Sequence, residues 1–255
     1  MENWALILGA SSGIGEACAQ ALAKEGINIF GLYLRKPNEH IEKIIQKIEK
    51  NNVKVIFKKA NASNENSREE IVSELLNIGD IKIKMFIHSL AFGALKTMIG
   101  DKNNSLTKKN IEMTQEVMCN NLIYWSQDLF NNNLLGRGSH IISMTSAGGR
   151  KNWAQYGAVS LAKSGLESIT RQLSIELAKY NIAVNTIQAG VTDTPALRKI
   201  PGFEKMKDQA TNNNPHGRLT TPDDIGEVIR MLVNYNSSWM TGNIIKVDGG
   251  EDITG

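Results

Sequence analysis

Two side chains in the second half of the sequence, Tyr156 and Lys163, have the types and the spacing needed for acid catalysis. They fall in a segment of helical periodicity, residues 153–179, and stand seven positions apart, which is about two helical turns. Both should therefore lie on the same side of the helix. A phenol close to an ammonium group can donate a hydrogen bond or a proton to an oxygen that gains negative charge.

A glycine-rich turn near the N-terminus is the second candidate site. It stands between a short apolar run and a helical pattern. Glycines there let the backbone approach a pyrophosphate, and the free N–H groups of a helix N-terminus attract its negative charge. The position of the turn after a first strand predicts a dinucleotide-binding site made by Gly9, Ser11, Ser12, Gly13, Ile14 and Gly15.

The same turn also fits the Gly-x-Ser-x-Gly pattern of a nucleophile elbow, so a serine hydrolase is a distant alternative. Such an elbow normally follows a later, central strand and needs a histidine downstream. His88 and His140 fall on predicted strands and His40 on an early helix, which leaves only His216 as a late loop base. These positions argue against the hydrolase.

The end of the predicted second strand bears on the choice of dinucleotide. Units that bind NAD place an acidic residue there to hold the ribose hydroxyls. This strand instead ends in Tyr33-Leu34-Arg35-Lys36. Because a guanidinium suits a phosphate well, Arg35 predicts NADPH through its 2′-phosphate, with NADH left open. Ser12 argues the other way, since a basic residue in the turn would have helped to hold that phosphate.

Short apolar runs alternate with helical patterns along all 255 residues. The expected strands are residues 4–8, 27–34, 53–57, 83–88, 140–144, 182–188 and 244–247, and most are apolar on successive residues, as in strands covered on both faces. The expected helices are residues 14–24, 39–50, 68–77, 111–132, 153–179 and 222–233. This alternation predicts one α/β domain, residues 1–255, with a parallel sheet and right-handed crossovers. Residues 191–221 are expected to form a long irregular substrate loop, since long loops in compact domains are usually functional. Its apolar residues Pro195, Leu197, Ile200 and Phe203 are expected to line an acyl pocket.

Together with these motifs, Ser146 at the end of the fifth predicted strand makes the chain resemble the short-chain dehydrogenase/reductase family over essentially its whole length. The resemblance implies a Rossmann-type, doubly wound sheet of seven parallel strands in the order 3-2-1-4-5-6-7, with helices on both faces, and a homotetramer. It also implies dinucleotide contacts from residues after the third and sixth strands, namely Asn61, Ala62, Gly190, Val191, Thr192 and Thr194.

Three departures from the family pattern resemble its enoyl-acyl-carrier-protein reductase branch. The usual tyrosine, four positions before the lysine, is here Val159, so the spacing becomes Tyr-x6-Lys. Met118 stands where a proton-relaying asparagine is usual, although Asn120 and Asn121 leave that alignment open. The usual Asn-Ala-Gly after the fourth strand is replaced by a segment that implies cofactor contacts from Ser89, Leu90 and Ala91.

The shift of the tyrosine has a chemical meaning. It moves the phenol about one helical turn, roughly 5 Å, along the helix. Hydride transfer to an enoyl thioester leaves negative charge on an oxygen two carbons beyond the attacked carbon, whereas in a ketone the two atoms are adjacent. The resemblance therefore implies that Tyr156 serves the enolate oxygen and that Lys163 holds the nicotinamide ribose hydroxyls. Ser146 is expected either to bond the substrate or to cap the strand end.

The predicted function is NADPH-dependent reduction of the trans-2 double bond of an enoyl thioester in fatty acid synthesis, with acyl carrier protein or coenzyme A as carrier. A carbonyl or 3-oxoacyl reductase is the main alternative, and a dinucleotide sensor without turnover is a distant one. The net charge of +3 and the absence of an RNA-binding signature predict no nucleic-acid partner. The two cysteines have no disulfide or metal-ligand spacing, so no metal is expected. Without a signal peptide or an apolar run of membrane-spanning length, a cytoplasmic protein is expected.

Overall fold

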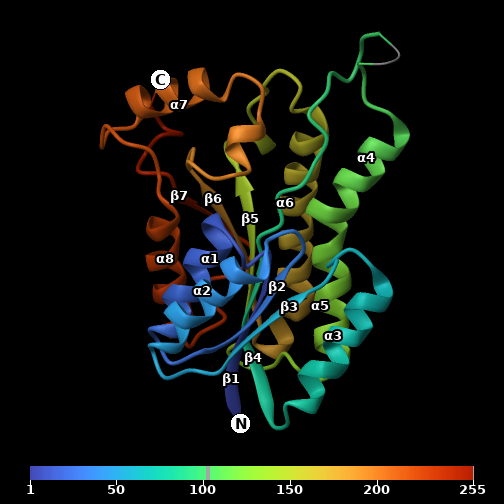
Figure 1. The fold of residues 1–255 in the computed structure, drawn as a ribbon, viewed down its shortest axis with the longest axis vertical. Coiled ribbons are helices and arrows are strands. Elements are labelled where there is room, and N and C mark those ends of the chain that lie inside the picture. Colours follow the sequence, from blue (N-terminus) through green and yellow to red (C-terminus); the bar gives the residue numbers. More distant parts are fainter. Residues whose placement is uncertain (102–103, 255) are drawn as a thin grey trace.

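A computed structural model of the chain describes residues 1–101 and 104–254. Within these residues, seven strands form one parallel sheet in the order β3-β2-β1-β4-β5-β6-β7, which confirms the predicted topology (Figure 1). The strands are β1 Glu2–Leu8, β2 Asn28–Tyr33, β3 Val55–Lys59, β4 Ile81–His88, β5 His140–Ser146, β6 Ala183–Ala189 and β7 Ile244–Val247. All seven predicted runs are strands, with their ends shifted by no more than two residues.

Helices cover both faces of the sheet (Figure 1). One face carries α1 (Gly13–Ala23), α2 (Asn38–Glu49) and α8 (Pro222–Asn234), and the other carries α3 (Glu65–Asn77), α4 (Lys108–Gln115), α5 (Asn121–Asn131) and α6 (Gly157–Leu177). Each face has its own hydrophobic cluster, because successive side chains of a strand point to opposite sides. Along β1, Leu6 and Leu8 belong to the α3–α5–α6 cluster, whereas Ala5 and Ile7 belong to the α1–α2–α8 cluster.

Three segments differ from the sequence-based prediction. The helix that carries Lys163 begins at Gly157 and not at residue 153, because Gln155 has a left-handed backbone with φ of 63° that interrupts any helix through it. The predicted helix 111–132 is divided by a π-helical turn, η1 (Glu116–Asn120), into α4 and α5. The expectation that residues 191–221 are irregular was wrong for α7 (Phe203–Asn213), which lies beyond the carboxyl edge of the sheet (Figure 1).

Candidate active site

The glycine-rich turn packs so closely that side chains are excluded at two positions. Gly9 has φ of 86°, and a Cβ atom there would overlap the carbonyl oxygen of Ser89 at the end of β4. A Cβ atom on Gly15 would overlap the carbonyl oxygen of Gly9. The turn after β1, the first turn of α1 and the segment after β4 therefore meet backbone to backbone, which only glycine permits.

The N-terminus of α1 is built to receive an anion. Ser12 is the N-cap residue with an extended backbone, and among the described residues its side chain caps none of the free N–H groups of the first turn. The Ser11 side chain is turned away from solvent, and its carbonyl oxygen contacts Nε2 of His40 at 2.9 Å. An uncapped helix N-terminus behind a glycine turn fits the pyrophosphate of a dinucleotide.

Three of the other predicted dinucleotide residues, Ser89, Leu90 and Thr194, lie beside this turn. Leu90 lies 3.5 Å from the position of a Gly9 Cβ atom, and Thr194 lies 3.2 Å from that of a Gly13 Cβ atom. Ile14 packs against the α1–α2–α8 cluster, while Ala91 is exposed on the segment after β4. The turn therefore brings together residues from the loops after β1, β4 and β6.

The loop after β6 is fixed from two directions. The backbone N–H of Val191 donates to Oε2 of Glu251 at 2.9 Å, and the Thr192 hydroxyl donates to the carbonyl oxygen of Gly190 at 2.8 Å. Thr192 also forms an isolated parallel bridge with Thr220 just before α8. The bridge brings the two ends of the predicted substrate loop together.

Asn61 and Ala62 follow β3, as predicted, but their contacts are structural in this conformation. The Asn61 side chain is exposed and accepts a hydrogen bond from the backbone of Ser63 at 3.2 Å. Ala62 is buried, and its carbonyl oxygen accepts a hydrogen bond from the indole of Trp125 at 2.9 Å. These contacts shape the turn that leads into α3.

Arg35 lies at the exposed end of β2, beyond its last residue. Its guanidinium carbon stands 4.1 Å above the centre of the Phe92 ring, on the segment after β4. A cation above the face of an aromatic ring is attracted to the ring, so Phe92 favours this position of the guanidinium. The contact thus helps to place the one residue that the sequence singled out for a 2′-phosphate.

The second half of the site gathers around Tyr156, which occupies the N-cap position of α6 and not its interior. A Cβ atom on Gly148 would stand 2.5 Å from Cε1 of the Tyr156 ring and 3.2 Å from the hydroxyl oxygen of Ser146. The Tyr156 ring and the Ser146 hydroxyl therefore both lie beside Gly148. Burial raises the pKa of Tyr156, and the neighbouring Ser146 hydroxyl partly offsets this effect.

Ser146, at the end of β5, has an unusual environment for a hydroxyl. Its Oγ atom is buried and has no hydrogen-bond partner of good geometry among the described residues. Buried polar groups are rarely left unpaired, because this forfeits the hydrogen bonds that water would make. The alternative that Ser146 merely caps the strand finds no supporting hydrogen bond, whereas a role toward a bound molecule would supply the missing partner.

Lys163 of α6 is buried beside the loop between β5 and α6. Its ammonium donates to the carbonyl oxygen of Met144 at 2.5 Å. Burial lowers the pKa of Lys163 to about 8, and the charge of Glu167, one turn further along α6, opposes this. Glu167 is itself buried and accepts a hydrogen bond from the Thr145 hydroxyl at 2.8 Å. The spacing of four residues after Lys163 could have revealed this carboxylate in the sequence.

His88 lies at the end of β4 and was expected to be a strand residue, which is correct. Burial lowers the pKa of His88 to about 3, and the nearby charge of Lys163 adds to the effect. The imidazole is therefore neutral at physiological pH. The lysine is thus the cationic member of this buried pair.

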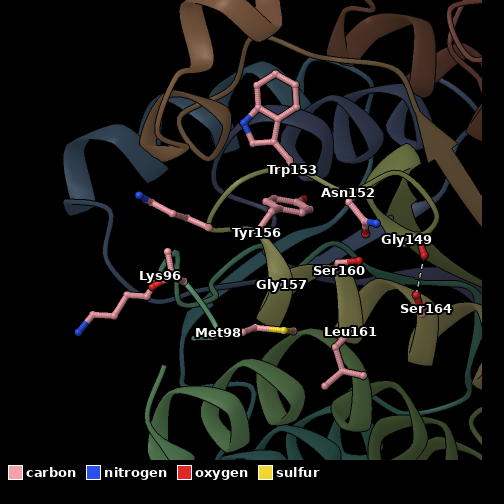
Figure 2. A pocket seen from close by; sticks show the side chains of 12 residues that line it. Lys96, Met98, Gly149, Asn152, Trp153, Tyr156, Gly157, Ser160, Leu161 and Ser164 are labelled. Carbon is pink, nitrogen blue, oxygen red and sulfur yellow. Dashed lines mark hydrogen bonds between the residues drawn. The ribbon is translucent and has the colours of Figure 1, made fainter. Parts of the chain in front are cut away.

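A cavity of about 610 Å³ opens beside Tyr156 (Figure 2). Three segments line it: the chain after β4, the loop between β5 and α6, and the first two turns of α6. The lining residues are Lys96, Thr97, Met98, Gly149, Asn152, Trp153, Gln155, Tyr156, Gly157, Ser160, Leu161 and Ser164. In Figure 2 the Met98 side chain extends toward α6, where a Cβ atom on Gly157 would collide with it.

Four residues of the 191–221 segment were expected to line an acyl pocket: Pro195, Leu197, Ile200 and Phe203. They do not line this cavity. The 191–221 segment instead contacts one residue that lines the cavity: the indole N–H of Trp153 donates to the carbonyl oxygen of Pro201 at 3.4 Å. Gly149, Asn152, Trp153 and Gln155 line the cavity from the loop between β5 and α6. The sequence did not indicate these residues, because the loop contains no chemical motif.

Position 159, where the family usually has its tyrosine, is occupied by a buried valine. Val159 is 5% exposed, and its Cγ2 atom lies 2.7 Å from the position of a Cβ atom on Gly93. Met118, in the π-helical turn, and Thr114 press on the same glycine. The position at which ordinary members have a phenol is therefore buried and apolar.

The comparisons with known proteins agree with this geometry. A family model described as "Enoyl-(Acyl carrier protein) reductase" matches residues 9–251. The chain belongs to the short-chain dehydrogenase/reductase family, and within it resembles the enoyl-acyl-carrier-protein reductase branch. It is thus an oxidoreductase of a nicotinamide-dinucleotide-binding fold, and the serine hydrolase alternative is removed.

Individual relatives are distant, and their names include two different reductase activities. The chain is 27% identical to the enoyl-acyl-carrier-protein reductase (NADH) FabI of Enterococcus faecalis, over 94% of this chain and 93% of that protein. The match to the protein of the same name from Buchnera aphidicola is 29% identical and covers 66% of this chain and 64% of that protein. The chain is also 26% identical to the 3-oxoacyl-acyl-carrier-protein reductase FabG of Thermotoga maritima, over 96% of both. The solved enoyl-acyl-carrier-protein reductase (NADH) of Aquifex aeolicus superimposes with a TM-score of 0.84 at 25% identity, covering 100% of this chain and 97% of that one.

Across residues 1–101 and 104–254, no helix is long and apolar enough to cross a membrane. The same residues contain no group of three or more His, Cys, Asp or Glu side chains that could hold a metal ion.

Both cysteines, Cys18 and Cys119, are buried and free, and burial raises the pKa of each thiol, to about 12 and about 11.

Proposed function

We propose that this family member reduces the trans-2 double bond of an enoyl thioester carried by acyl carrier protein, with NADPH as the reductant. The observation that carries the proposal is the position of Tyr156. Its ring lies at the N-cap of α6, on the wall of the cavity, while an apolar Val159 fills the place from which a ketone would be protonated. The homotetramer implied by the family resemblance stays a prediction.

The site residues fit a bound dinucleotide. The uncapped N-terminus of α1 and the turn from Gly9 to Gly15 would hold its pyrophosphate, and Lys163 would hold the nicotinamide ribose. Residues after β3, β4 and β6 would line the rest of the molecule: Asn61, Ala62, Ser89, Leu90, Ala91, Gly190, Val191, Thr192 and Thr194. When bound, the reduced cofactor supplies a hydride to carbon 3 of the substrate.

Tyr156 then acts on the opposite end of the conjugated system. As carbon 3 gains the hydride, the electron pair of the double bond moves toward the thioester, and negative charge develops on its carbonyl oxygen. The phenol donates a hydrogen bond to that oxygen, and carbon 2 finally takes up a proton. A preorganised donor in a water-poor site is the largest single contribution to such catalysis in many enzymes.

The raised pKa of Tyr156 keeps the phenol protonated at neutral pH, so that it can donate and not accept. The charge of Lys163 lies two helical turns further along α6 and stabilises an oxyanion at this end of the sheet. Ser146, with no partner of its own beside Tyr156, offers a second hydroxyl to the substrate oxygen.

Ser146 also favours a second candidate function, reduction of a 3-oxoacyl thioester. The serine occupies the place that ordinary members of the family use for carbonyl reduction, and one relative of near-complete overlap is named a 3-oxoacyl reductase. In that case hydride and proton would go to the carbon and oxygen of one carbonyl group. The Ser146 and Tyr156 hydroxyls would both have to reach that oxygen.

A substrate panel decides between the two. Oxidation of NADPH is followed by its absorbance with a trans-2-enoyl thioester, the matching 3-oxoacyl thioester and a simple ketone, each at several concentrations. We expect kcat/KM for the enoyl substrate to exceed that for the 3-oxoacyl substrate at least tenfold. The reverse order would replace the first candidate by the second, and no turnover of any substrate would favour the dinucleotide sensor.

The preference for NADPH rests on the end of β2. Residues 33–36 carry no carboxylate for the ribose hydroxyls, and the guanidinium carbon of Arg35 lies 4.1 Å from the centre of the Phe92 ring. The relatives named above as FabI carry NADH in their names, so the same assay run with NADH tests the preference directly.

A further inference from the structure

The turn after β7 contains an aspartate that three cations surround. The Asp252 side chain is only 5% exposed and contacts Arg150 at 3.0 Å, Lys151 at 2.9 Å and Lys246 at 2.7 Å. Arg150 and Lys151 belong to the loop between β5 and α6, about a hundred residues earlier in the chain, whereas Lys246 belongs to β7 itself. One carboxylate thus joins the C-terminal turn to the loop that carries the site.

The carboxylate is held in its charged form. Burial on its own would raise the pKa of Asp252, but hydrogen bonds from Lys246 and Lys151 outweigh this and hold the pKa well below its usual range. An ionised, poorly hydrated carboxylate with several charge-assisted hydrogen bonds constrains its partners strongly. Removing the charge would leave three cations together without a counterion, which is costly at a site of low exposure.

The loop that Asp252 holds determines where two hydroxyls of the site lie. Ser146 ends β5 just before this loop, and Tyr156 begins α6 just after it. Within the loop, the Gly149 carbonyl oxygen accepts a hydrogen bond from Ser164 at 2.6 Å, and Arg150 also donates to Gln188 of β6. Arg150 and Lys151 are therefore the residues through which the middle of the loop is tied to the rest of the sheet.

The same C-terminal turn holds the loop on the other side of the site. Glu251 accepts the backbone N–H of Val191, as described above, and Asn214 donates to the Asp248 carbonyl oxygen at 2.8 Å. Two adjacent carboxylates thus fix the loops that follow β5 and β6. Because the partner of Glu251 is a backbone N–H, only the contacts of Asp252 allow the side chains on both sides to be substituted.

We propose that Asp252 is a positioning residue, which places Ser146 and Tyr156 by holding Arg150 and Lys151 of the intervening loop. The proposal rests on the proposed function in that these two hydroxyls are assigned to the substrate oxygen. Displacing catalytic groups by about 1 Å typically costs turnover far more than it costs binding, since reactive geometry is lost first. Asp252 itself touches no substrate atom and acts through the loop.

The test compares Asp252→Asn with substitutions of its partners, in the full-length protein. We expect D252N to lower kcat about tenfold or more, with the dissociation constant of NADPH, measured by its fluorescence, changed less than twofold. The double variant R150M/K151M should lower kcat to a similar extent, and adding D252N to it should lower kcat no further. K246M is the matched control: it removes a cation from the same carboxylate but not from the loop, so kcat should stay within about twofold of wild type.

Hydrogen exchange of the peptide spanning residues 147–156 gives a readout that does not depend on turnover. It should rise in D252N and in R150M/K151M and stay unchanged in K246M. Wild-type kcat and exchange in D252N would overturn the proposal, as would an equal loss of kcat in K246M. Tyr156→Phe, assayed alongside, separates the two levels: full activity there contradicts the proposed function, while the exchange result still decides whether Asp252 holds the loop.

Discussion

The ring of Tyr156 rests directly on Gly148, so closely that a Cβ atom at position 148 would stand 2.5 Å from its Cε1 atom. The Ser146 hydroxyl oxygen borders the same glycine, at 3.2 Å from that Cβ position. A methyl group at this point has no room unless the ring moves. The contact therefore offers a way to displace the catalytic phenol without altering it.

Gly148→Ala is accordingly expected to lower kcat by about tenfold or more while NADPH still binds. Gly136→Ala is the control, because the nearest heavy atoms to its new Cβ atom are those of a flexible lysine at 3.8 Å and the substitution is absorbed there. Steady-state kinetics and NADPH fluorescence titration measure the two effects. Unchanged kcat in Gly148→Ala would mean that the ring position does not limit the reaction.

Tyr156→Phe keeps the ring and its contact with Gly148 but removes the hydroxyl. Loss of one oxyanion donor typically lowers the rate by about 10²–10³-fold, so kcat should fall by that order while affinity for NADPH persists. Ser146→Ala should have a smaller effect on an enoyl substrate than on a 3-oxoacyl substrate, if the serine serves mainly carbonyl chemistry. Full activity of Tyr156→Phe would mean that the phenol does not serve the substrate oxygen and would contradict the proposed mechanism.

Lys163 makes the reaction depend on pH in a predictable direction. With a pKa of about 8, lowered by burial, its ammonium is charged below that pH and neutral above it. Binding of NADPH should therefore weaken as pH rises through about 8. Glu167→Gln removes a neighbouring negative charge that supports the ammonium, so the midpoint should move to lower pH. A binding profile that is flat between pH 7 and 9.5 would argue against Lys163 as a ribose ligand.

The same shift affects stability with a defined sign. The lysine has an ordinary pKa of 10.5 when unfolded and about 8 when folded, so between these values the unfolded chain binds more protons. The free energy of unfolding should then gain a contribution as pH rises across that window. Lys163→Met should remove this contribution, which urea titrations at several pH values would show.

Arg35→Ala tests the choice of dinucleotide. A charged hydrogen bond to phosphate contributes about 1.5–3 kcal/mol, so KM for NADPH should rise roughly ten- to a hundredfold. KM for NADH should hardly change, since NADH has no 2′-phosphate. Phe92→Leu is a useful companion, because it removes the ring that orients the guanidinium and should produce a smaller change in the same direction. Equal loss of both cofactors would contradict the assignment.

The fold was predictable because its signal is local and repeated. Runs such as residues 4–8 are apolar on successive positions, as expected for a strand buried on both faces, and their alternation with helices leaves few topologies. The glycine turn was predictable for a related reason, since Gly9 and Gly15 permit a backbone approach that no other residue allows.

The sequence failed where tertiary contacts determine the backbone. Residues 153–156 fit a helical pattern, yet the left-handed Gln155 delays the helix and places Tyr156 at its N-cap. The π-helical turn around Met118 has no signature in periodicity, since one extra residue only shifts the phase of the helix. The contacts of Asp252 with the loop before α6 could not be predicted for another reason. Arg150 and Lys151 lie about a hundred residues earlier in the chain, and no sequence motif connects them to Asp252.

The bridge between Thr192 and Thr220 has a consequence for how this protein family diversifies. The bridge brings residues 192 and 220 side by side. The segment between these residues is therefore a loop whose two ends are held together. The entropic cost of closing such a loop grows only with the logarithm of its length. Insertions or deletions around α7 can therefore accumulate without moving β6 or α8, so the length of this segment can differ between relatives while the ends of the sheet keep their positions.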